Sequence, residues 1–153
     1  MNLFRLICTV VLFGFLSSCE DDPFRVDYSS VPAPFVTEGT ERVELPSGLV
    51  YYVVEEGVGS QEVVIRDRVL IYYTGRNSEG AIFDSSYENG NEIPRNNNVT
   101  DFNAGFTEGL IGMKTGEKRV FVIPPELGYG DVEGHSLQEE TITFDVELVA
   151  ILL

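Results

Sequence analysis

The stretch from Gly105 to Gly130 constrains the fold of this chain more than any other part of the sequence. Phe106, Leu110 and Met113 are spaced at i, i+4 and i+7, which places them on one face of a helix. The helix is short and contains two glycines, so it is not stable alone and must pack its apolar stripe on another surface. The stretch therefore predicts a helix held by a sheet.

The rest of this stretch predicts the elements that follow the helix. Gly116 is typical of the position just after a helix, so we expect the helix to stop there. Residues 118–123 read as a strand, which Pro124-Pro125 ends because proline cannot donate to a sheet ladder. The glycine-rich loop at 127–130 then presents the hydroxyl group of Tyr129.

The C-terminal segment gives the clearest strand signal in the chain. From Thr141 to Ile151, apolar side chains alternate with polar or charged ones, and this period of two indicates a strand with one buried face. Further strands are predicted at 49–54, 63–74 and 81–84, and a long polar loop at 85–98. No strand–helix–strand repeat suggests parallel pairing. We therefore predict an α+β fold, an antiparallel sheet curled over one short helix.

The N-terminus has the features of a bacterial export signal. Arg5 precedes the apolar run Leu6–Leu16, and small residues follow, so residues 1–18 are predicted to be a signal peptide. Leu16-Ser17-Ser18-Cys19 resembles the lipobox, in which the cysteine carries lipid and becomes the new N-terminus. The alternative is an ordinary signal peptide with an incidental cysteine at Cys19.

The cysteine content favours the lipid hypothesis. The chain has only Cys8 and Cys19, and Cys8 leaves with the signal, so the mature chain cannot form an internal disulfide. More than one lipid chain on Cys19 would give stable membrane anchoring. The acidic run Glu20-Asp21-Asp22 resembles a surface-export tag of some Gram-negative lipoproteins, and a solvated spacer explains it equally well.

Charge and composition restrict the partners and divide the chain. The formal net charge is -15, and loss of Arg5 with the signal peptide makes it -16. Such a chain would repel nucleic acid, so neutral or basic polypeptides are the expected partners, although acidity also serves solubility alone. Residues 19–47 contain four prolines and no sustained period, which predicts a flexible, semi-extended tether. Residues 48–153 suffice for one domain.

Within that domain, five blocks of sequence resemble the FKBP-type peptidyl-prolyl cis-trans isomerases. The resemblance covers roughly residues 48–151, and no single block would be specific alone. The blocks are Tyr73-Thr74-Gly75, Phe83-Asp84-Ser85-Ser86, the segment from Gly105 to Arg119, Ile123 to Gly130, and Phe144-Asp145-Val146-Glu147-Leu148. The resemblance implies a half-barrel of five or six antiparallel strands wrapped on one helix, with a prolyl pocket between the helix and the sheet.

The resemblance also implies roles for individual residues. Phe106 would form the pocket floor, where many relatives carry tryptophan, with aromatic walls around it. Tyr129 would donate its hydroxyl to a substrate carbonyl, and Asp84 would bind Tyr73 at the edge. The implied catalytic residues are Tyr73, Asp84, Phe106, Tyr129 and Phe144. The implied substrate-binding residues are Phe83, Phe102, Asn103, His135 and Leu137. Simple core packing is the alternative role for each aromatic residue.

Three features depart from the family pattern. The entrance to the helix reads Phe102-Asn103 in place of Val-Ile, which changes one wall and leaves the backbone N–H of Asn103 to serve a ligand. The loop after Tyr129 lacks the usual Ile-Pro pair, for which His135 and Leu137 are the nearest substitutes. Gly128 replaces alanine beside the tyrosine. Substrate preference and rate should differ from the family norm as a result.

The sequence thus predicts a monomeric, lipid-anchored isomerase in the cell envelope of a Gram-negative bacterium, acting on proline-containing polypeptides during folding of exported proteins. No cofactor or metal is expected, since rotation about an amide breaks no bond and His135 is the only histidine. The alternative is a binding module or chaperone that keeps the fold with little catalysis.

Overall fold

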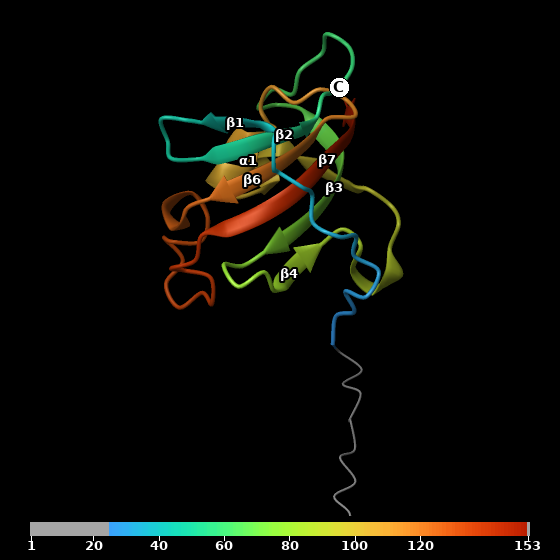
Figure 1. The fold of residues 1–153 in the computed structure, drawn as a ribbon. Helices are drawn as coiled ribbons and strands as arrows, with labels where there is room; N and C mark the ends of the chain where they lie inside the picture. The colour runs from blue at the N-terminus through green and yellow to red at the C-terminus, as the bar shows by residue number, and fades with distance from the viewer. Residues whose placement is uncertain (1–24, 153) are drawn as a thin grey trace, which may run out of the picture.

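The computed structural model describes residues 25–152 (Figure 1). The predicted signal peptide and Cys19 lie outside this part of the chain. The strands are β1 (Glu41–Glu44), β2 (Val50–Glu55), β3 (Arg68–Arg76), β4 (Ile82–Ser85), β5 (Arg95–Asn98), β6 (Lys118–Ile123) and β7 (Ile142–Leu152). The helices are α1 (Ala104–Leu110) and the 3-10 turns η1 (Glu88–Gly90), η2 (Val99–Asp101) and η3 (Pro125–Leu127).

All seven strands belong to one antiparallel sheet, which confirms the predicted α+β fold of the FKBP type. Six strands follow the order β1-β2-β6-β7-β3-β4, and β5 pairs with β3 next to β4. Helix α1 lies behind the sheet in Figure 1. The alternation predicted for β7 is present, with Ile142, Phe144, Val146 and Leu148 buried between half-exposed neighbours. Their common face supplies the apolar surface that the short helix needs.

Helix α1 ends earlier than predicted. The side chain of Asn103 caps its N-terminus by accepting a hydrogen bond from the Phe106 N–H at 2.9 Å. Phe106 and Leu110 are buried, but the helix stops at Leu110 and Met113 lies beyond it. The predicted stop at Gly116 is therefore wrong.

A buried ion pair on β6 holds the C-terminal end of α1. Arg119 pairs with Glu117, and both side chains are almost fully buried. Arg119 Nη1 also donates to the carbonyl oxygen of Gly109 at 3.1 Å, and its guanidinium carbon lies 4.4 Å from the centre of the Tyr51 ring. Carbonyl groups at a helix C-terminus have no partner within the helix, so Arg119 satisfies one of them from a neighbouring strand. The helix ends before Gly116 because Ile111 leaves the helical conformation and Gly112 adopts a positive φ of 80°.

Two predicted boundaries in the middle of the chain are also corrected. The strand expected at 63–74 begins only at Arg68, because Asp67 accepts a hydrogen bond from the Val64 N–H at 2.9 Å and closes a turn. The polar loop expected at 85–98 ends in strand β5, whose residues 95–98 pair with the first half of β3. Strand β5 was predicted as a loop because its asparagine side chains lack the alternation of apolar residues that indicates a strand.

The predicted tether differs most from the structure. Residues 41–44 form β1, which pairs with β2 at one edge of the sheet. Residues 25–36, which we call the N-terminal arm, cross the sheet on the face opposite α1 (Figure 1). The Phe35 N–H donates to Asp145 Oδ1 at 3.4 Å, and Arg76 Nη2 donates to the Pro32 carbonyl at 3.4 Å. The arm is extended as predicted, but its backbone groups bind the domain.

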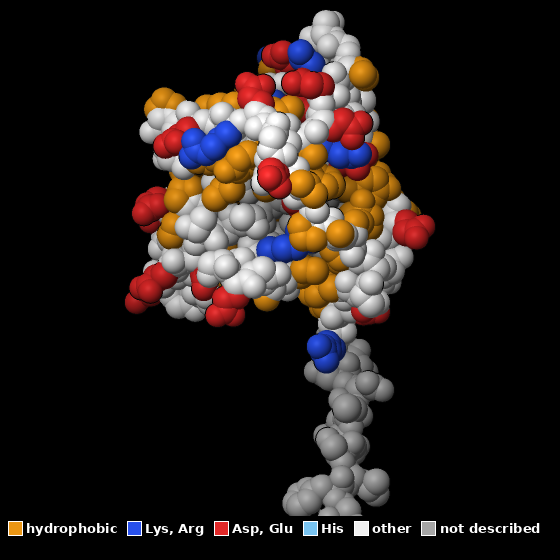
Figure 2. Space-filling model, viewed as in Figure 1, with side chains coloured by type: hydrophobic (Ala, Val, Ile, Leu, Met, Phe, Trp, Pro, Cys, Tyr) orange, Lys and Arg blue, Asp and Glu red, His pale blue; other side chains and the backbone are white. Residues whose placement is uncertain are grey.

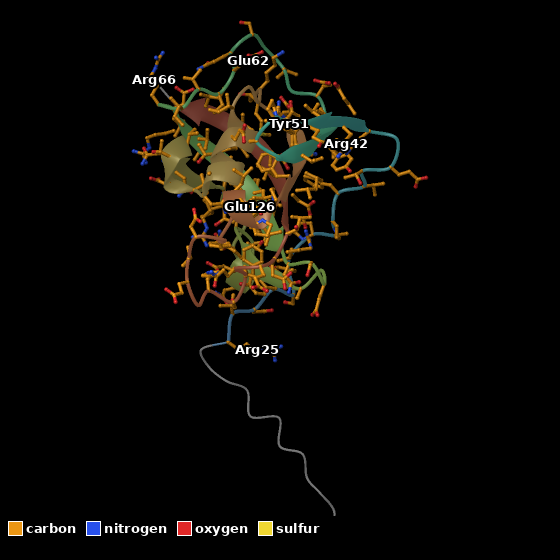
Figure 3. All side chains as sticks on the ribbon, turned by 90° about the vertical axis from the view of Figure 1, so that its left-hand side faces the viewer. Arg25, Arg42, Tyr51, Glu62, Arg66 and Glu126 are labelled. Carbon is orange, nitrogen blue, oxygen red and sulfur yellow. The ribbon has the colours of Figure 1, made fainter. Side chains whose placement is uncertain are left out.

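The arm runs to one end of the molecule. Figure 3 shows Arg25 at that end, with Glu62 and Arg66 at the other. Figure 2 shows hydrophobic side chains gathered on the side that the arm crosses. Within residues 25–152, no helix has the length and apolar character required to cross a membrane.

Candidate functional site

The aromatic residues predicted to form a pocket do meet in space, between α1 and the inner face of the sheet. Phe106 is in edge-to-face contact with Phe144 on β7, at 4.9 Å between ring centres, and with Tyr73 on β3, at 5.8 Å. Phe83 on β4 contacts the other side of Phe144 at 5.5 Å and reaches Tyr129 at 6.3 Å. Edge-to-face contacts of this kind stabilise aromatic clusters beyond the burial of their area. The structure thus forms one continuous aromatic cluster from five predicted site residues.

The close packing of two of these rings depends on Gly75. Gly75 lies on β3, and a Cβ atom at this position would come within 2.5 Å of the Phe144 ring and 2.8 Å of the Phe83 ring. Separations below 3.0 Å are essentially never seen for a real Cβ atom. The Tyr-Thr-Gly motif therefore contributes both a wall, Tyr73, and the space that two other walls occupy.

Asp84 provides the polar group at the edge of the cluster. The Tyr73 hydroxyl donates to both carboxylate oxygens of Asp84, at 3.3 and 3.2 Å. Burial raises the pKa of Asp84, although the hydrogen bond from Tyr73 opposes the shift. Burial also raises the pKa of Tyr73 well above its usual range, with a further contribution from the negative charge of Asp84. Tyr73 therefore remains a protonated donor to Asp84.

Sequence reasoning missed the charged pair next to Asp84. Arg95 on β5 pairs with Glu88, and both charges act on Asp84: Glu88 raises its pKa and Arg95 lowers it. The Nε atom of Arg95 is buried and has no hydrogen-bond partner among the described residues. The pair could not be predicted because residues 85–98 were expected to be a loop. Only the pairing of β5 with β3 brings Arg95 next to the site.

The loop after β6 covers one side of the cluster. Tyr129 and His135 stack face to face, with ring centres 4.2 Å apart. Within residues 25–152 the Tyr129 hydroxyl has no hydrogen-bond partner, and burial raises the pKa of Tyr129, so the group is a protonated donor. His135 Nδ1 accepts from the Leu137 N–H at 3.1 Å, and Leu137 is buried in the core. His135 therefore lies where a pocket loop was expected, whereas Leu137 packs mainly inside the domain.

The altered entrance before α1 covers the expected pocket floor. The Phe102 ring stacks on Phe106, with centres 4.3 Å apart and planes 23° apart. Phe106 is only 1% exposed as a result of this contact and the surrounding rings. Asn103 uses its side chain as the helix cap, and its backbone N–H has no acceptor among the residues that the structure describes. The entrance thus combines a free N–H group with a closed floor.

A hollow lies on the outer face of these strands, beneath the N-terminal arm. It has a volume of about 140 Å³ and runs between the N-terminal arm and the outer side chains of β3 and β7. Pro32, Phe35, Tyr72, Tyr87 and Glu147 contribute to its lining. Of the predicted site residues, only Tyr73 also contributes to this lining, and Phe106 and Phe144 do not. Among residues 25–152, no group of three His, Cys, Asp or Glu side chains could hold a metal ion.

Comparison with known proteins agrees with this geometry. Residues 59–149 match the model of the FKBP-type peptidyl-prolyl cis-trans isomerase family. This chain belongs to that family. The FK506-binding protein 1A of Neurospora crassa is 39% identical over 106 residues, which are 68% of this chain and 88% of that protein. The crystal structure of FkpA from Escherichia coli matches with a TM-score of 0.66 and 37% identity, over 72% of this chain and 51% of that one.

Other FKBP-type relatives are longer than this chain. A probable FKBP-type peptidyl-prolyl cis-trans isomerase of Haemophilus influenzae is 36% identical over 134 residues, which are 86% of this chain and 51% of that protein. This chain thus spans about half the length of several relatives that it matches. The family model matches residues 59–149, which lie within the folded domain described above.

Proposed function

We propose that this chain is a peptidyl-prolyl cis-trans isomerase and that the aromatic cluster is its active site. The observation that carries the proposal is the convergence of Tyr73, Phe83, Phe106, Tyr129 and Phe144 around one carboxyl group, Asp84. Membership of the FKBP family supports it.

The reaction suits a site of this composition. Rotation about an X-Pro bond is slow because the planar amide has partial double-bond character, and it needs no nucleophile or metal. A site accelerates it by binding the twisted amide more tightly than either planar form. Twisting reduces charge separation in the amide, so an apolar enclosure around Phe106 and Phe144, which are 1% and 4% exposed, favours the twisted form.

Two hydrogen-bond donors can orient the peptide. The Tyr129 hydroxyl is protonated and has no partner among the described residues, so it can donate to a substrate carbonyl. The backbone N–H of Asn103 can serve a second carbonyl at the entrance. Asp84, held by Tyr73, places one carboxyl group at the edge of the otherwise apolar cluster. The catalytic roles of these groups are part of the proposal.

The entrance requires a movement before the floor can be used. Phe102 stacks on Phe106, so a prolyl ring that lies on Phe106 must displace the Phe102 ring. Displacement costs the stacking contact of about 0.5–1.5 kcal/mol and is offset by the contacts of the proline. We therefore expect a lower affinity for prolyl peptides than an open floor would give.

The test is exchange between cis and trans forms of short X-Pro peptides, measured by NMR with the full chain in detergent. The wild-type chain should accelerate exchange over buffer, and Tyr129→Phe should slow it on the order of tenfold, as expected for one lost hydrogen bond to the transition state. Tyr72→Phe is the matched control, because its hydroxyl donates to the Glu92 carbonyl at 2.7 Å and does not face the cluster. Wild-type exchange no faster than buffer for several X residues would refute the proposal.

A second candidate function follows from the closed floor. If Phe102 stays on Phe106, the domain would bind extended polypeptides as a chaperone without fast isomerisation. Phe102→Ala distinguishes the two functions. An isomerase gated by Phe102 should gain affinity for prolyl peptides in this variant, whereas a pure binding module should suppress aggregation equally with and without Phe102 and show no exchange.

We further propose that Cys19 carries lipid and anchors the chain in the cell envelope of a Gram-negative bacterium, where it would act on exported, proline-containing polypeptides as a monomer. The lipobox-like sequence before Cys19 supports this proposal, and residues 1–18 would be removed. Cys19→Ser should move the protein from the membrane fraction to the soluble fraction. Unchanged fractionation would contradict the anchor and leave the isomerase proposal intact.

A further inference from the structure

Strand β4 carries two groups of the site but has weak support from the sheet. It is only four residues long, contains Phe83 and Asp84, and forms the end of the strand order. Among residues 25–152, its only strand neighbour is β3. Short edge strands have backbone groups without partners on their free side. The position of Phe83 and Asp84 therefore depends on whatever binds that free side.

The pairing of β4 with β3 is also interrupted at Phe83. The paired residues are Thr74 with Ser85, Gly75 with Asp84, and Arg76 with Ile82, and the register shifts between Gly75 and Arg76. Phe83 is the residue of β4 that this register skips. Its carbonyl group must find a donor elsewhere, because a buried carbonyl without a hydrogen bond destabilises the fold.

The N-terminal arm supplies that donor. The Tyr28 hydroxyl donates to the Phe83 carbonyl at 3.1 Å. The Tyr28 ring is half-buried, and its pKa is raised by burial and by the negative charges of Asp84 and Glu88, so the hydroxyl remains a donor close to the site. Tyr28, which precedes Phe83 by 55 positions in the chain, thus binds β4, the strand that carries Asp84.

The neighbouring arm residues bind the loop that follows β4. Two hydrogen bonds join Asp27 and Asn89: the Asn89 N–H donates to the Asp27 carbonyl at 2.7 Å, and the Asp27 N–H donates to the side-chain Oδ1 of Asn89 at 3.0 Å. Ser30 Oγ donates to the Tyr87 carbonyl at 2.8 Å. This loop contains Glu88, which acts on Asp84 directly and pairs with Arg95.

We propose that Tyr28 is a positioning residue of the isomerase site, and that arm residues 27–30 hold β4 and its loop in the geometry that Asp84 and Phe83 require. Tyr28 touches no substrate and acts through the Phe83 carbonyl. The inference rests on the proposed isomerase function and adds a segment of the predicted tether to the active unit.

The first test compares Tyr28→Phe with Tyr72→Phe in the full chain. Each variant removes one tyrosine hydroxyl that donates to a backbone carbonyl, and only the first carbonyl belongs to β4. The kcat/KM for X-Pro peptide exchange should fall about fivefold in Tyr28→Phe and stay within about twofold of wild type in Tyr72→Phe. Equal activity of the two variants would overturn the proposal.

The second test separates positioning from general stability. If Tyr28 acts through Asp84, the effect of Tyr28→Phe should largely disappear in a chain that already carries Asp84→Ala. A merely structural role would give effects on exchange that multiply independently. Multiplicative effects in this double-mutant cycle would therefore also overturn the proposal.

The third test does not depend on activity. Amide hydrogen exchange of β4, residues 82–85, should accelerate in Tyr28→Phe and not in Tyr72→Phe, whose hydroxyl and ring contact the loop after β4, while the amides of β2 and β6 stay unchanged in both. If wild-type protein showed no isomerisation, the proposed function would fail, and this measurement would still decide whether Tyr28 orders β4. Unchanged exchange at residues 82–85 would show that Tyr28 does not position this strand.

Discussion

The two faces of strand β7 are stabilised in different ways. On the inner face, Phe144, Val146 and Leu148 are buried against α1 and neighbouring strands, and the one ion pair there, Arg119 with Glu117, is itself buried among the described residues. On the outer face, Asp145 lies beneath the N-terminal arm, where it pairs with Arg76 and accepts from the backbone of Phe35.

This difference shows which part of the fold is tolerant of change. Apolar packing on the inner face is non-directional and involves many contacts, so it gives a large total stabilisation. The outer face depends on one ion pair, whose side chains are only 10% and 12% exposed, and on a few backbone hydrogen bonds. We expect the inner face to determine whether the chain folds and the outer face to determine where the arm lies.

The largest effect is expected from the inner face. Phe121 is completely buried and contacts Phe106 edge to face at 5.3 Å. Phe121→Ala should lower the free energy of unfolding by about 3–5 kcal/mol, because it removes apolar contacts and leaves a cavity. Urea unfolding followed by circular dichroism measures this loss. Phe35→Ala on the arm is the matched control, and an equal loss there would contradict the difference between the faces.

A smaller effect is expected from the ion pair beneath the arm. Arg76→Met leaves the buried carboxylate of Asp145 without its cation and should lower the free energy of unfolding by about 3 kcal/mol. The double variant Arg76→Met with Asp145→Leu should recover most of that stability, since no charge then remains buried. Thermal unfolding of the three proteins makes the comparison, and no recovery in the double variant would mean that the pair itself stabilises the arm.

The smallest effect concerns the pH dependence of stability. Burial raises the pKa of Asp84 in the folded state above its unfolded value, so the contribution of this group is fully present below the unfolded pKa and is lost as pH rises through the folded pKa. Asp84→Asn removes this ionisation. The variant should therefore gain stability relative to wild type at neutral pH and lose that advantage in acid. Denaturation midpoints at about pH 4 and pH 7 test the sign, and an advantage confined to acid would refute it.

The inner face could be predicted from sequence because its signal is local. The strict alternation from Thr141 to Ile151 gave β7, and the spacing of Phe106 and Leu110 gave the buried side of α1. Each of these patterns is contained within one element. The family motifs then predicted the hydrogen bond between Tyr73 and Asp84, which the structure contains.

The elements that were missed depend on partners far away in the sequence. Strand β5 has asparagine side chains and is a strand only because β3 offers an open edge. The end of α1 is an exception, because a local glycine, Gly112 with a φ of 80°, ends the helix before Gly116, and the apolar spacing alone did not distinguish the two glycines. The closure of the floor by Phe102 depends on the orientation of one ring, which the change of residue type at the entrance indicated without showing its direction.

The contacts between the arm and the domain were not predicted, because they also join residues far apart in the sequence. Proline-rich, aperiodic sequence predicts an extended segment, and residues 25–36 are extended. Their contacts use backbone groups and single side chains such as Tyr28 and Ser30, which leave no periodic pattern. Composition therefore predicted the conformation of the arm and could not predict that it binds the sheet.

The docked arm has a geometric consequence for a chain anchored at Cys19. A free tether from Cys19 to Ser47 could extend at most about 95 Å, and one from Cys19 to Arg25 at most about 20 Å. If Cys19 carries lipid, the arm therefore shortens the working radius of the domain roughly fivefold. The first bound arm residues contact β4 and its loop, so the edge of the proposed site would stay near the bilayer surface. Such a protein would serve polypeptides that pass close to its own membrane.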